Sequence, residues 1–129
     1  MIYLDTSAIV KLVVKEPESP ALHDYLSAHP ERVSSALARV ELTRALRRAE
    51  RSESTLERAA AVLQRLALVP LDDIVLEAAA RVEPVALRSL DALHLATALS
   101  LPPLAAFVAY DERLLAAARG IGLAVAAPG

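Results

Sequence analysis

Short apolar segments alternate with segments of helical periodicity along the whole chain. The first apolar segment, Ile2–Leu4, ends abruptly at Asp5, and apolar residues then recur at helical spacing as far as Val14. The alternation continues to a last apolar segment at 123–126. This pattern predicts an α/β fold, a three-layer α/β/α sandwich in which helices cover both faces of a short, mainly parallel central sheet.

The bounds of the expected elements follow from residues that start and stop helices. We expect Thr6 or Ser7 to cap the first helix, Ser35 to cap a long one, and Gly120 to end the last. The expected strands are 2–4, 33–34, 68–71, 107–110 and 123–126, and the expected helices are 8–14, 20–28, 35–51, 54–66, 72–82, 89–99 and 112–119. Because no repeat or linker divides the 129 residues, we expect a single domain over 1–129.

Two acids directly follow expected strands. Asp5 comes after Ile2–Leu4, and Asp111 comes after the apolar segment 107–110. In an open parallel sheet the functional site lies beyond the carboxyl ends of the strands, where the strand order reverses. Aspartate is also among the best helix N-caps, so each acid could instead serve only to cap the helix that follows it. Their shared position nevertheless predicts a site that contains both carboxylates.

Two further acids lie on the inner margins of expected helices. Glu41 borders the apolar stripe of its helix, although a salt bridge to Arg44 or Arg48 is an alternative. Asp91 stands in a first turn, where the helix dipole favours acids, but it shares a face with Leu95. Repulsion among four such carboxylates would favour a bound cation.

The composition limits the chemistry of such a site. The chain has no cysteine, which excludes thiolate metal sites, disulfides and a cysteine nucleophile. Carboxylate ligands favour hard cations such as Mg²⁺ or Mn²⁺. With a net charge of −2 and 3% aromatic residues, any contact with nucleic acid requires a local basic patch rather than a stacking platform.

Basic residues gather on the two helices expected between 35 and 66. Such a surface suits contacts with the phosphates of a nucleic acid, although a solvated face paired with neighbouring glutamates is an equal alternative. His94 lies one turn from Asp91, and we expect it to pack or to orient that acid. The residues that we expect to contact phosphate are Lys11, Arg44, Arg47, Arg48 and Arg88.

Four segments in this order resemble PIN domains, and specifically the VapC toxins of bacterial toxin–antitoxin pairs. They are Met1–Leu12 with Asp5-Thr6-Ser7, Val40-Glu41-Leu42, Leu87–Ala98 with Asp91 and His94, and Tyr110–Leu114 with Asp111. The resemblance extends over essentially the whole chain. It implies a PIN-like fold and a metal-dependent endoribonuclease that requires Mg²⁺ or Mn²⁺. It also implies an RNA substrate, a homodimer, and a hetero-oligomer with a small VapB-like antitoxin.

The resemblance further implies that Asp5, Glu41, Asp91 and Asp111 form the acidic, metal-binding pocket, with support from the Ser7 hydroxyl. One position departs from the pattern. Many relatives carry serine or threonine two residues before the last aspartate, where this chain has Ala109.

Other functions remain as alternatives to this interpretation. A PIN-fold module that is catalytically weak and acts through a partner protein is one. A receiver-like phosphoacceptor domain is another, but Asp72-Asp73 are poorly placed for its acidic pair. A haloacid-dehalogenase-type phosphatase needs an aspartate where Ser7 stands.

The sequence shows neither a basic, signal-like N-terminus nor an apolar stretch long enough to span a bilayer. We therefore expect a cytoplasmic protein with no membrane partner.

Overall fold

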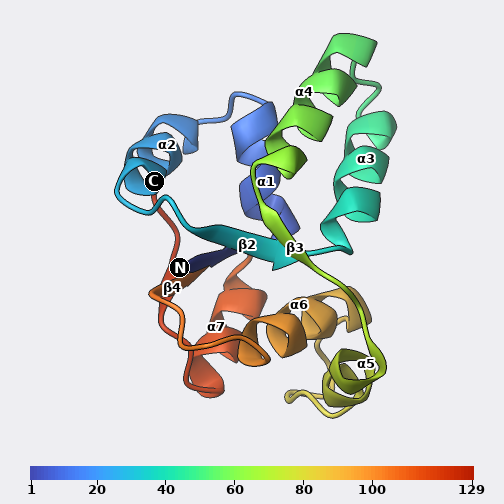
Figure 1. Ribbon diagram of the computed structural model, residues 1–129, viewed down its shortest axis with the longest axis vertical. Helices are drawn as coiled ribbons and strands as arrows, with labels where there is room; N and C mark the ends of the chain where they lie inside the picture. Colours follow the sequence, from blue (N-terminus) through green and yellow to red (C-terminus); the bar gives the residue numbers. More distant parts are fainter.

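In the computed structural model, which describes residues 1–129, a parallel sheet separates two layers of helices (Figure 1). The five strands lie in the order β3-β2-β1-β4-β5, and every neighbouring pair is parallel. This arrangement confirms the expected α/β/α sandwich. The strands are β1 (Ile2–Leu4), β2 (Arg32–Ser35), β3 (Ala67–Val69), β4 (Ala106–Val108) and β5 (Val125–Ala126).

Helices α1 to α4 cover one face of the sheet and α5 to α7 cover the other (Figure 1). All seven expected helices are present, and their ends differ from the expected ones by at most three residues. The helices are α1 (Thr6–Val13), α2 (Ser19–Ser27), α3 (Ala38–Arg48), α4 (Glu53–Gln64), α5 (Asp73–Ala80), α6 (Ser89–Leu99) and α7 (Glu112–Gly120).

The prediction that Ser35 caps α3 was wrong. Ser35 is the last residue of β2, and its hydroxyl accepts a hydrogen bond from the N–H of Leu37 at 3.0 Å, before the helix begins. The helix also ends earlier than residue 51, because Glu50 adopts a positive φ of 54° that an α-helix cannot continue through. Glu41 therefore lies in the first turn of α3.

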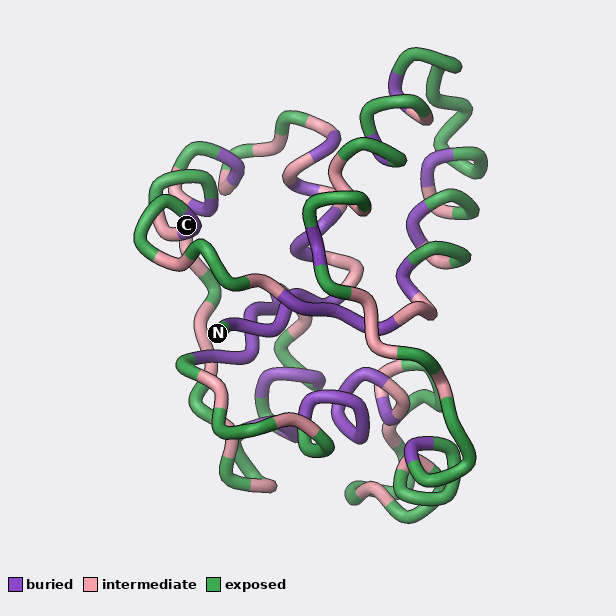
Figure 2. Tube along the Cα trace, in the orientation of Figure 1, coloured by how far each residue is buried: buried purple, intermediate pink, exposed green.

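Alternating side chains of the central strands supply both hydrophobic cores. Ile2 and Leu4 point into the core under α1 to α4, while Tyr3 points into the core with α6 and α7. Tyr3 stacks on Phe107 of β4, with ring centroids 5.1 Å apart. Figure 2 shows the central strands buried along their length, whereas α3 and α4 alternate between buried and exposed residues.

The strand order reverses between β1 and β4. From β1 the chain adds β2 and then β3 on one side, and it adds β4 and β5 on the other. Asp5 directly follows β1, and Asp111 follows β4 by three residues. Both acids therefore lie at the edge of the sheet where open parallel folds place their sites.

The packing of α3 on the sheet predicts a large cost for truncating Leu42, which is fully buried. We expect Leu42→Ala to lower the free energy of unfolding by about 2–5 kcal/mol, because it leaves a cavity between α3 and its neighbours. Val40→Ala is the matched control, since Val40 lies on the same helix and is 57% exposed. Urea denaturation of both variants measures the difference, and equal losses would contradict this account of the core.

Candidate active site

The Asp5 carboxylate is buried at the end of β1, where it caps α1. Its Oδ1 accepts hydrogen bonds from the N–H of Ala8 at 3.0 Å and from the hydroxyl of Ser7 at 2.7 Å. The expectation that Thr6 or Ser7 is the N-cap was therefore wrong, because both are already inside the helix. Since one oxygen makes both hydrogen bonds, Oδ2 is left for the site.

Burial of Asp5 changes its protonation. Desolvation raises the pKa of Asp5 to about 6, although the hydrogen bond from Ser7 and the charge of His94 act in the opposite direction. The negative charge of Asp91 raises this pKa further. Asp5 therefore holds an anionic charge at neutral pH at a cost in free energy, which a nearby cation would relieve.

Glu41 is held by residues from two other elements. Its Oε1 accepts hydrogen bonds from Thr6 Oγ1 at 2.7 Å and lies 2.6 Å from His94 Nε2. Burial acts to raise the pKa of Glu41, but the hydrogen bonds from His94 and Thr6 and the charge of His94 outweigh it, so this pKa is lowered. The alternative of a salt bridge to Arg44 or Arg48 is wrong, because the ion pair of Glu41 is with His94.

We expected His94 either to pack in the core or to orient Asp91. It is buried, as the first alternative has it, and its polar contact is with Glu41 rather than with Asp91. The residue is 1% exposed, and Nδ1 lies 2.7 Å from the Tyr3 hydroxyl. The sequence pointed to neither Tyr3 nor Thr6 as part of the site. The signal for Thr6 was its place between Asp5 and Ser7, whereas Tyr3 reads as an ordinary buried strand residue.

Asp91 and Asp111 line a second part of the site, a hollow of about 380 Å³. Asp91 pairs with Arg88, whose Nη2 lies 3.2 Å from Oδ2. Asp111 caps α7, because its Oδ1 accepts a hydrogen bond from the N–H of Leu114 at 2.9 Å. Asp111 therefore has the N-cap role that the sequence offered as an alternative to a role in the site. It also lines the same hollow as Asp91.

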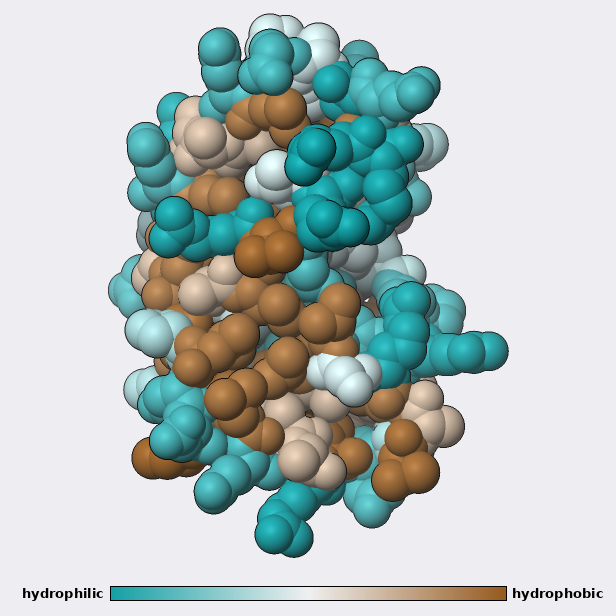
Figure 3. All heavy atoms as spheres, turned by 90° about the vertical axis from the view of Figure 1, so that its right-hand side faces the viewer, coloured by the Kyte–Doolittle hydropathy of each residue, from teal (hydrophilic) through white to brown (hydrophobic).

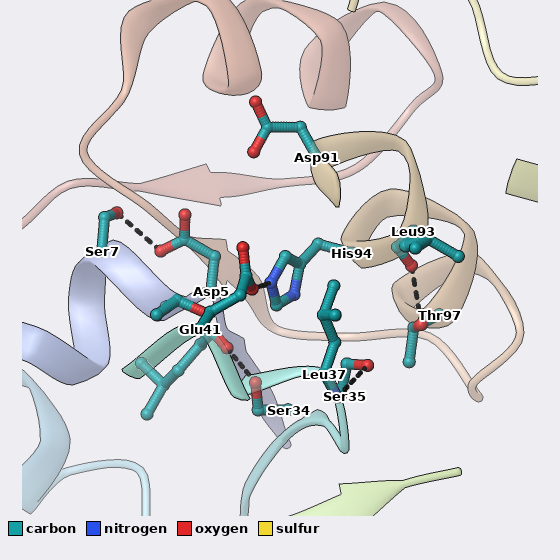
Figure 4. A network of polar contacts seen from close by, with 12 residues as sticks. Asp5, Ser7, Ser34, Ser35, Leu37, Glu41, Asp91, Leu93, His94 and Thr97 are labelled. Carbon is teal, nitrogen blue, oxygen red and sulfur yellow. Dashed lines mark hydrogen bonds and ion pairs between the residues drawn. The ribbon is translucent and has the colours of Figure 1, made fainter. Parts of the chain in front are cut away.

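Figure 4 shows the carboxylates of Asp5, Glu41 and Asp91 around a common space, with Ser7 beside Asp5. As these side chains stand, no three histidine or acidic groups lie close enough together to hold a metal ion. The four acids therefore border one region of the sheet edge without forming a ready-made cluster. The donors themselves, carboxylate oxygens of which one is buried, are of the type that hard cations prefer.

The Ser7 hydroxyl joins the ends of β1 and β4. It donates to Asp5 and accepts a hydrogen bond from the backbone N–H of Tyr110 at 3.2 Å. Ala109, which precedes Tyr110, is fully buried in the core with α6 and α7 and has no hydroxyl to contribute. The hydroxyl that supports Asp5 therefore comes from Ser7.

The basic residues separate into two groups. Lys11 is 9% exposed, lies 3.2 Å from Glu18, and stands 4.7 Å from the centroid of the Tyr110 ring. The charge of Lys11 is thus paired with that of Glu18, and its contact with phosphate stays a prediction. By contrast, three exposed arginines of α3 form no ion pair and line a hollow of about 260 Å³ by themselves: Arg44, Arg47 and Arg48.

Comparison with known proteins places the chain in a family. Residues 2–120 match the model of the PIN domain. The chain belongs to the PIN-domain family. It is 49% identical to ribonuclease VapC46 and 48% identical to ribonuclease VapC35, both of Mycobacterium tuberculosis. These alignments cover 98% and 100% of this chain and 97% and 98% of the relatives, so the chain is a VapC-type PIN protein.

Two solved structures share the fold. The first is Mycobacterium tuberculosis VapC20, a toxin that cleaves the sarcin-ricin loop, with a TM-score of 0.77 and 19% identity over 99% of this chain and all of that one. The second is VapBC2 from Rickettsia felis, bound to a DNA fragment from its promoter, with a TM-score of 0.79 and 16% identity over the full length of both chains. Membership of the PIN family leaves no support for the receiver-like alternative. Asp72 and Asp73 begin α5 instead, where Asp72 caps the helix.

The raised pKa of Asp5 predicts that the charge of this residue destabilises the metal-free protein. Because the pKa is raised from 3.8 to about 6, the folded state binds a proton more tightly, and stability falls as the pH rises between these values. Asn can place its side-chain oxygen where Oδ1 accepts both hydrogen bonds. We therefore expect Asp5→Asn in EDTA at pH 8 to be more stable than wild type by up to about 3 kcal/mol, and no more stable below about pH 4.

Chemical denaturation at pH 4, 6 and 8 measures this difference. The control is Asp24→Asn on the exposed side of α2, which should show no such dependence on pH. An Asp5→Asn variant that is less stable than wild type at pH 8 would mean that the cap needs the charge.

Proposed function

We propose that this protein is a metal-dependent endoribonuclease and the toxin of a VapBC-type toxin–antitoxin pair. The observation that carries the proposal is the buried Asp5 carboxylate at the reversal of strand order, with Glu41 and Asp91 facing the same space. Full-length identity of 49% to a VapC ribonuclease supports it. The proposal includes a single domain over 1–129 and a cytoplasmic location. None of the helices has the length and apolarity that crossing a bilayer requires.

The donor set fits Mg²⁺ or Mn²⁺. Asp5 and Asp91 would be direct ligands, and Glu41 and Asp111 would bind directly or through water. The guanidinium of Arg88 lies 3.2 Å from Asp91, so the charge of this carboxylate is paired at the surface of the hollow. A bound ion of this kind lowers the pKa of a coordinated water and stabilises charge on the phosphodiester.

The residues of the chain supply the remaining parts of hydrolysis. Glu41 is ionised at neutral pH because its pKa is lowered, so its carboxylate can orient a water molecule or accept its proton. Arg88 is 77% exposed and can turn from Asp91 to a substrate phosphate once a cation neutralises that acid. Ser7 and the N–H of Ala8 keep Asp5 fixed during these changes.

The α3 arginines are the proposed contact for the RNA backbone. Arg44 and Arg48 stand three and seven residues after Glu41, which places all three on one side of α3. A phosphate chain that leaves the acidic site along this side meets unpaired guanidinium groups. The net charge of −2 makes this local patch necessary for binding a polyanion.

The proposed partners are a small VapB-like antitoxin and a second copy of the chain, in a hetero-oligomer. The likeness to VapC proteins supports the antitoxin. Apolar side chains gather over the middle and lower part of the face shown in Figure 3. Exposed apolar residues on α5 and in the loop after it, Ile74, Leu76 and Val85, supply surface that a protein partner would cover.

One observation favours the second candidate function, a catalytically weak PIN module that acts through a partner. No three of the acids are close enough to hold a metal in this conformation. The two functions differ in whether the protein binds Mn²⁺ and cleaves RNA.

We expect Asp91→Asn to abolish cleavage and to reduce the rise in Tm that Mn²⁺ causes, because it removes an anionic ligand. Asp73→Asn is the matched control, since Asp73 also lies in the first turn of a helix and is exposed. RNA cleavage and thermal melts with Mn²⁺ or EDTA are the measurements. Wild-type cleavage that persists in excess EDTA, or an active Asp91→Asn protein, would reject the proposed mechanism.

We also expect the double variant Arg47→Ala/Arg48→Ala to bind RNA more weakly without a loss of stability. In a plot of the logarithm of the binding constant against the logarithm of the salt concentration, each lost phosphate contact should make the slope less steep by about one unit. Fluorescence anisotropy at several salt concentrations, with Mg²⁺ omitted, provides the measurement. Arg81→Ala/Arg119→Ala removes two exposed arginines from the ends of α5 and α7 and should leave affinity unchanged. Equal affinities of the two double variants would indicate that the α3 arginines form only a solvated face.

A further inference from the structure

A buried chain of three polar side chains runs from the sheet to the acidic site. The Tyr3 hydroxyl lies 2.7 Å from His94 Nδ1, and His94 Nε2 lies 2.6 Å from Glu41 Oε1. Tyr3 is fully buried and His94 is 1% exposed. Every buried side-chain nitrogen and oxygen in the protein has a partner, so this chain is fully satisfied.

The chemistry of the end groups assigns the hydrogens. An ionised carboxylate only accepts, so His94 Nε2 carries the hydrogen that it shares with Glu41. Burial raises the pKa of Tyr3 well above its usual range, so its hydroxyl stays protonated and hydrogen-bonded to Nδ1 of His94.

Both hydrogen bonds to Glu41 end on the same oxygen. His94 Nε2 and Thr6 Oγ1 share Oε1, at 2.6 and 2.7 Å, while Oε2 accepts no hydrogen bond from the protein. Figure 4 shows this second oxygen turned toward Asp5 and Asp91. Two donors on one oxygen favour a single plane for the carboxylate, in which the other oxygen faces the site.

The chain also joins the elements that carry the acids. Tyr3 lies on β1, two residues before Asp5, and His94 lies on α6, one turn after Asp91. Through His94, the position of Glu41 on α3 is therefore set relative to both of the other acids. Tyr3 itself is held by its stacking on Phe107 in the core.

We propose that His94, oriented by Tyr3, is a positioning residue that presents one oxygen of Glu41 to the cation and substrate. This inference rests on the proposed function for the identity of the bound groups. The positioning of Glu41 itself is a property of the metal-free protein. Hydrogen bonds that orient metal ligands are worth about tenfold to a hundredfold in metal affinity.

The test compares two substitutions of His94. Gln can place an amide N–H near the position of Nε2 and so donate to Glu41, whereas Leu fills similar space without a donor. We expect His94→Leu to weaken Mn²⁺ binding, measured by electron paramagnetic resonance without RNA, by about tenfold or more, and His94→Gln to recover most of this loss. His29→Leu removes a hydrogen-bonded histidine remote from the site and serves as the control.

A double-variant cycle separates positioning from general stability. In a Glu41→Gln background, His94→Leu should cause no further loss of Mn²⁺ affinity, because its effect passes through the carboxylate. If His94→Leu does not fold, Tyr3→Phe removes only the hydroxyl and should weaken Mn²⁺ binding in the same direction. Equal affinities of the wild-type, Leu and Gln proteins, or an undiminished loss in the Glu41→Gln background, would overturn the proposal.

Crystal structures without metal test the positioning of Glu41 independently of whether the protein binds Mn²⁺ or cleaves RNA. The Glu41 carboxylate should change orientation in His94→Leu and keep it in His94→Gln. A wild-type protein that binds no Mn²⁺ and cleaves no RNA would reject the proposed function, while these structures would still decide the positioning role. An unchanged carboxylate in the Leu variant would reject that role.

Discussion

A carboxylate buried at the end of β1 is the constraint on which the rest of the site depends. Asp5 is 5% exposed, and a charge at such a depth is costly unless it is hydrogen-bonded and paired. Ser7 and the start of α1 supply the hydrogen bonds, but they do not supply positive charge. The cost remains as the raised pKa of Asp5, and it creates a position at which a cation is favourable.

The polar residues around Asp5 form a support that the parallel sheet makes possible. Because β1 and β4 are neighbours, the hydroxyl of Ser7 reaches the backbone of Tyr110 and ties the two strand ends together. Because β1 alternates its side chains, Tyr3 reaches the opposite face and contacts His94. The site is therefore built from one strand and the first turn of α1, to which α3 and α6 add Glu41 and Asp91.

Charge is distributed unevenly between the two ends of α3. Its first turn carries the only acid of the helix, Glu41, beside the acidic site, together with the exposed Arg39, and its last turns carry exposed arginines without acidic partners. Acids near a helix N-terminus and bases near its C-terminus are also what the helix dipole favours, so this arrangement does not destabilise the helix. One helix thus joins a site for a cation to a surface for a polyanion.

The sequence by itself determined the α/β class, the approximate bounds of the elements and the position of the strand-end acids. These properties depend on local periodicity and on which residue follows a strand, so they can be predicted without knowledge of the tertiary structure. The helix caps could be predicted less well. Asp5, Thr6 and Ser7 are all suitable N-cap residues, and only the backbone geometry shows that Asp5 is the N-cap.

Only the tertiary structure decided which side chains act on one another. Glu41 has basic neighbours along its own helix, yet its partners are Thr6 and His94, which lie 35 and 53 residues away. Lys11 resembles a surface cation in the sequence, but packing places it against Tyr110 and pairs it with Glu18. Hydrogen bonds and ion pairs form between groups that the packed layers bring within reach, and sequence spacing carries no measure of that distance.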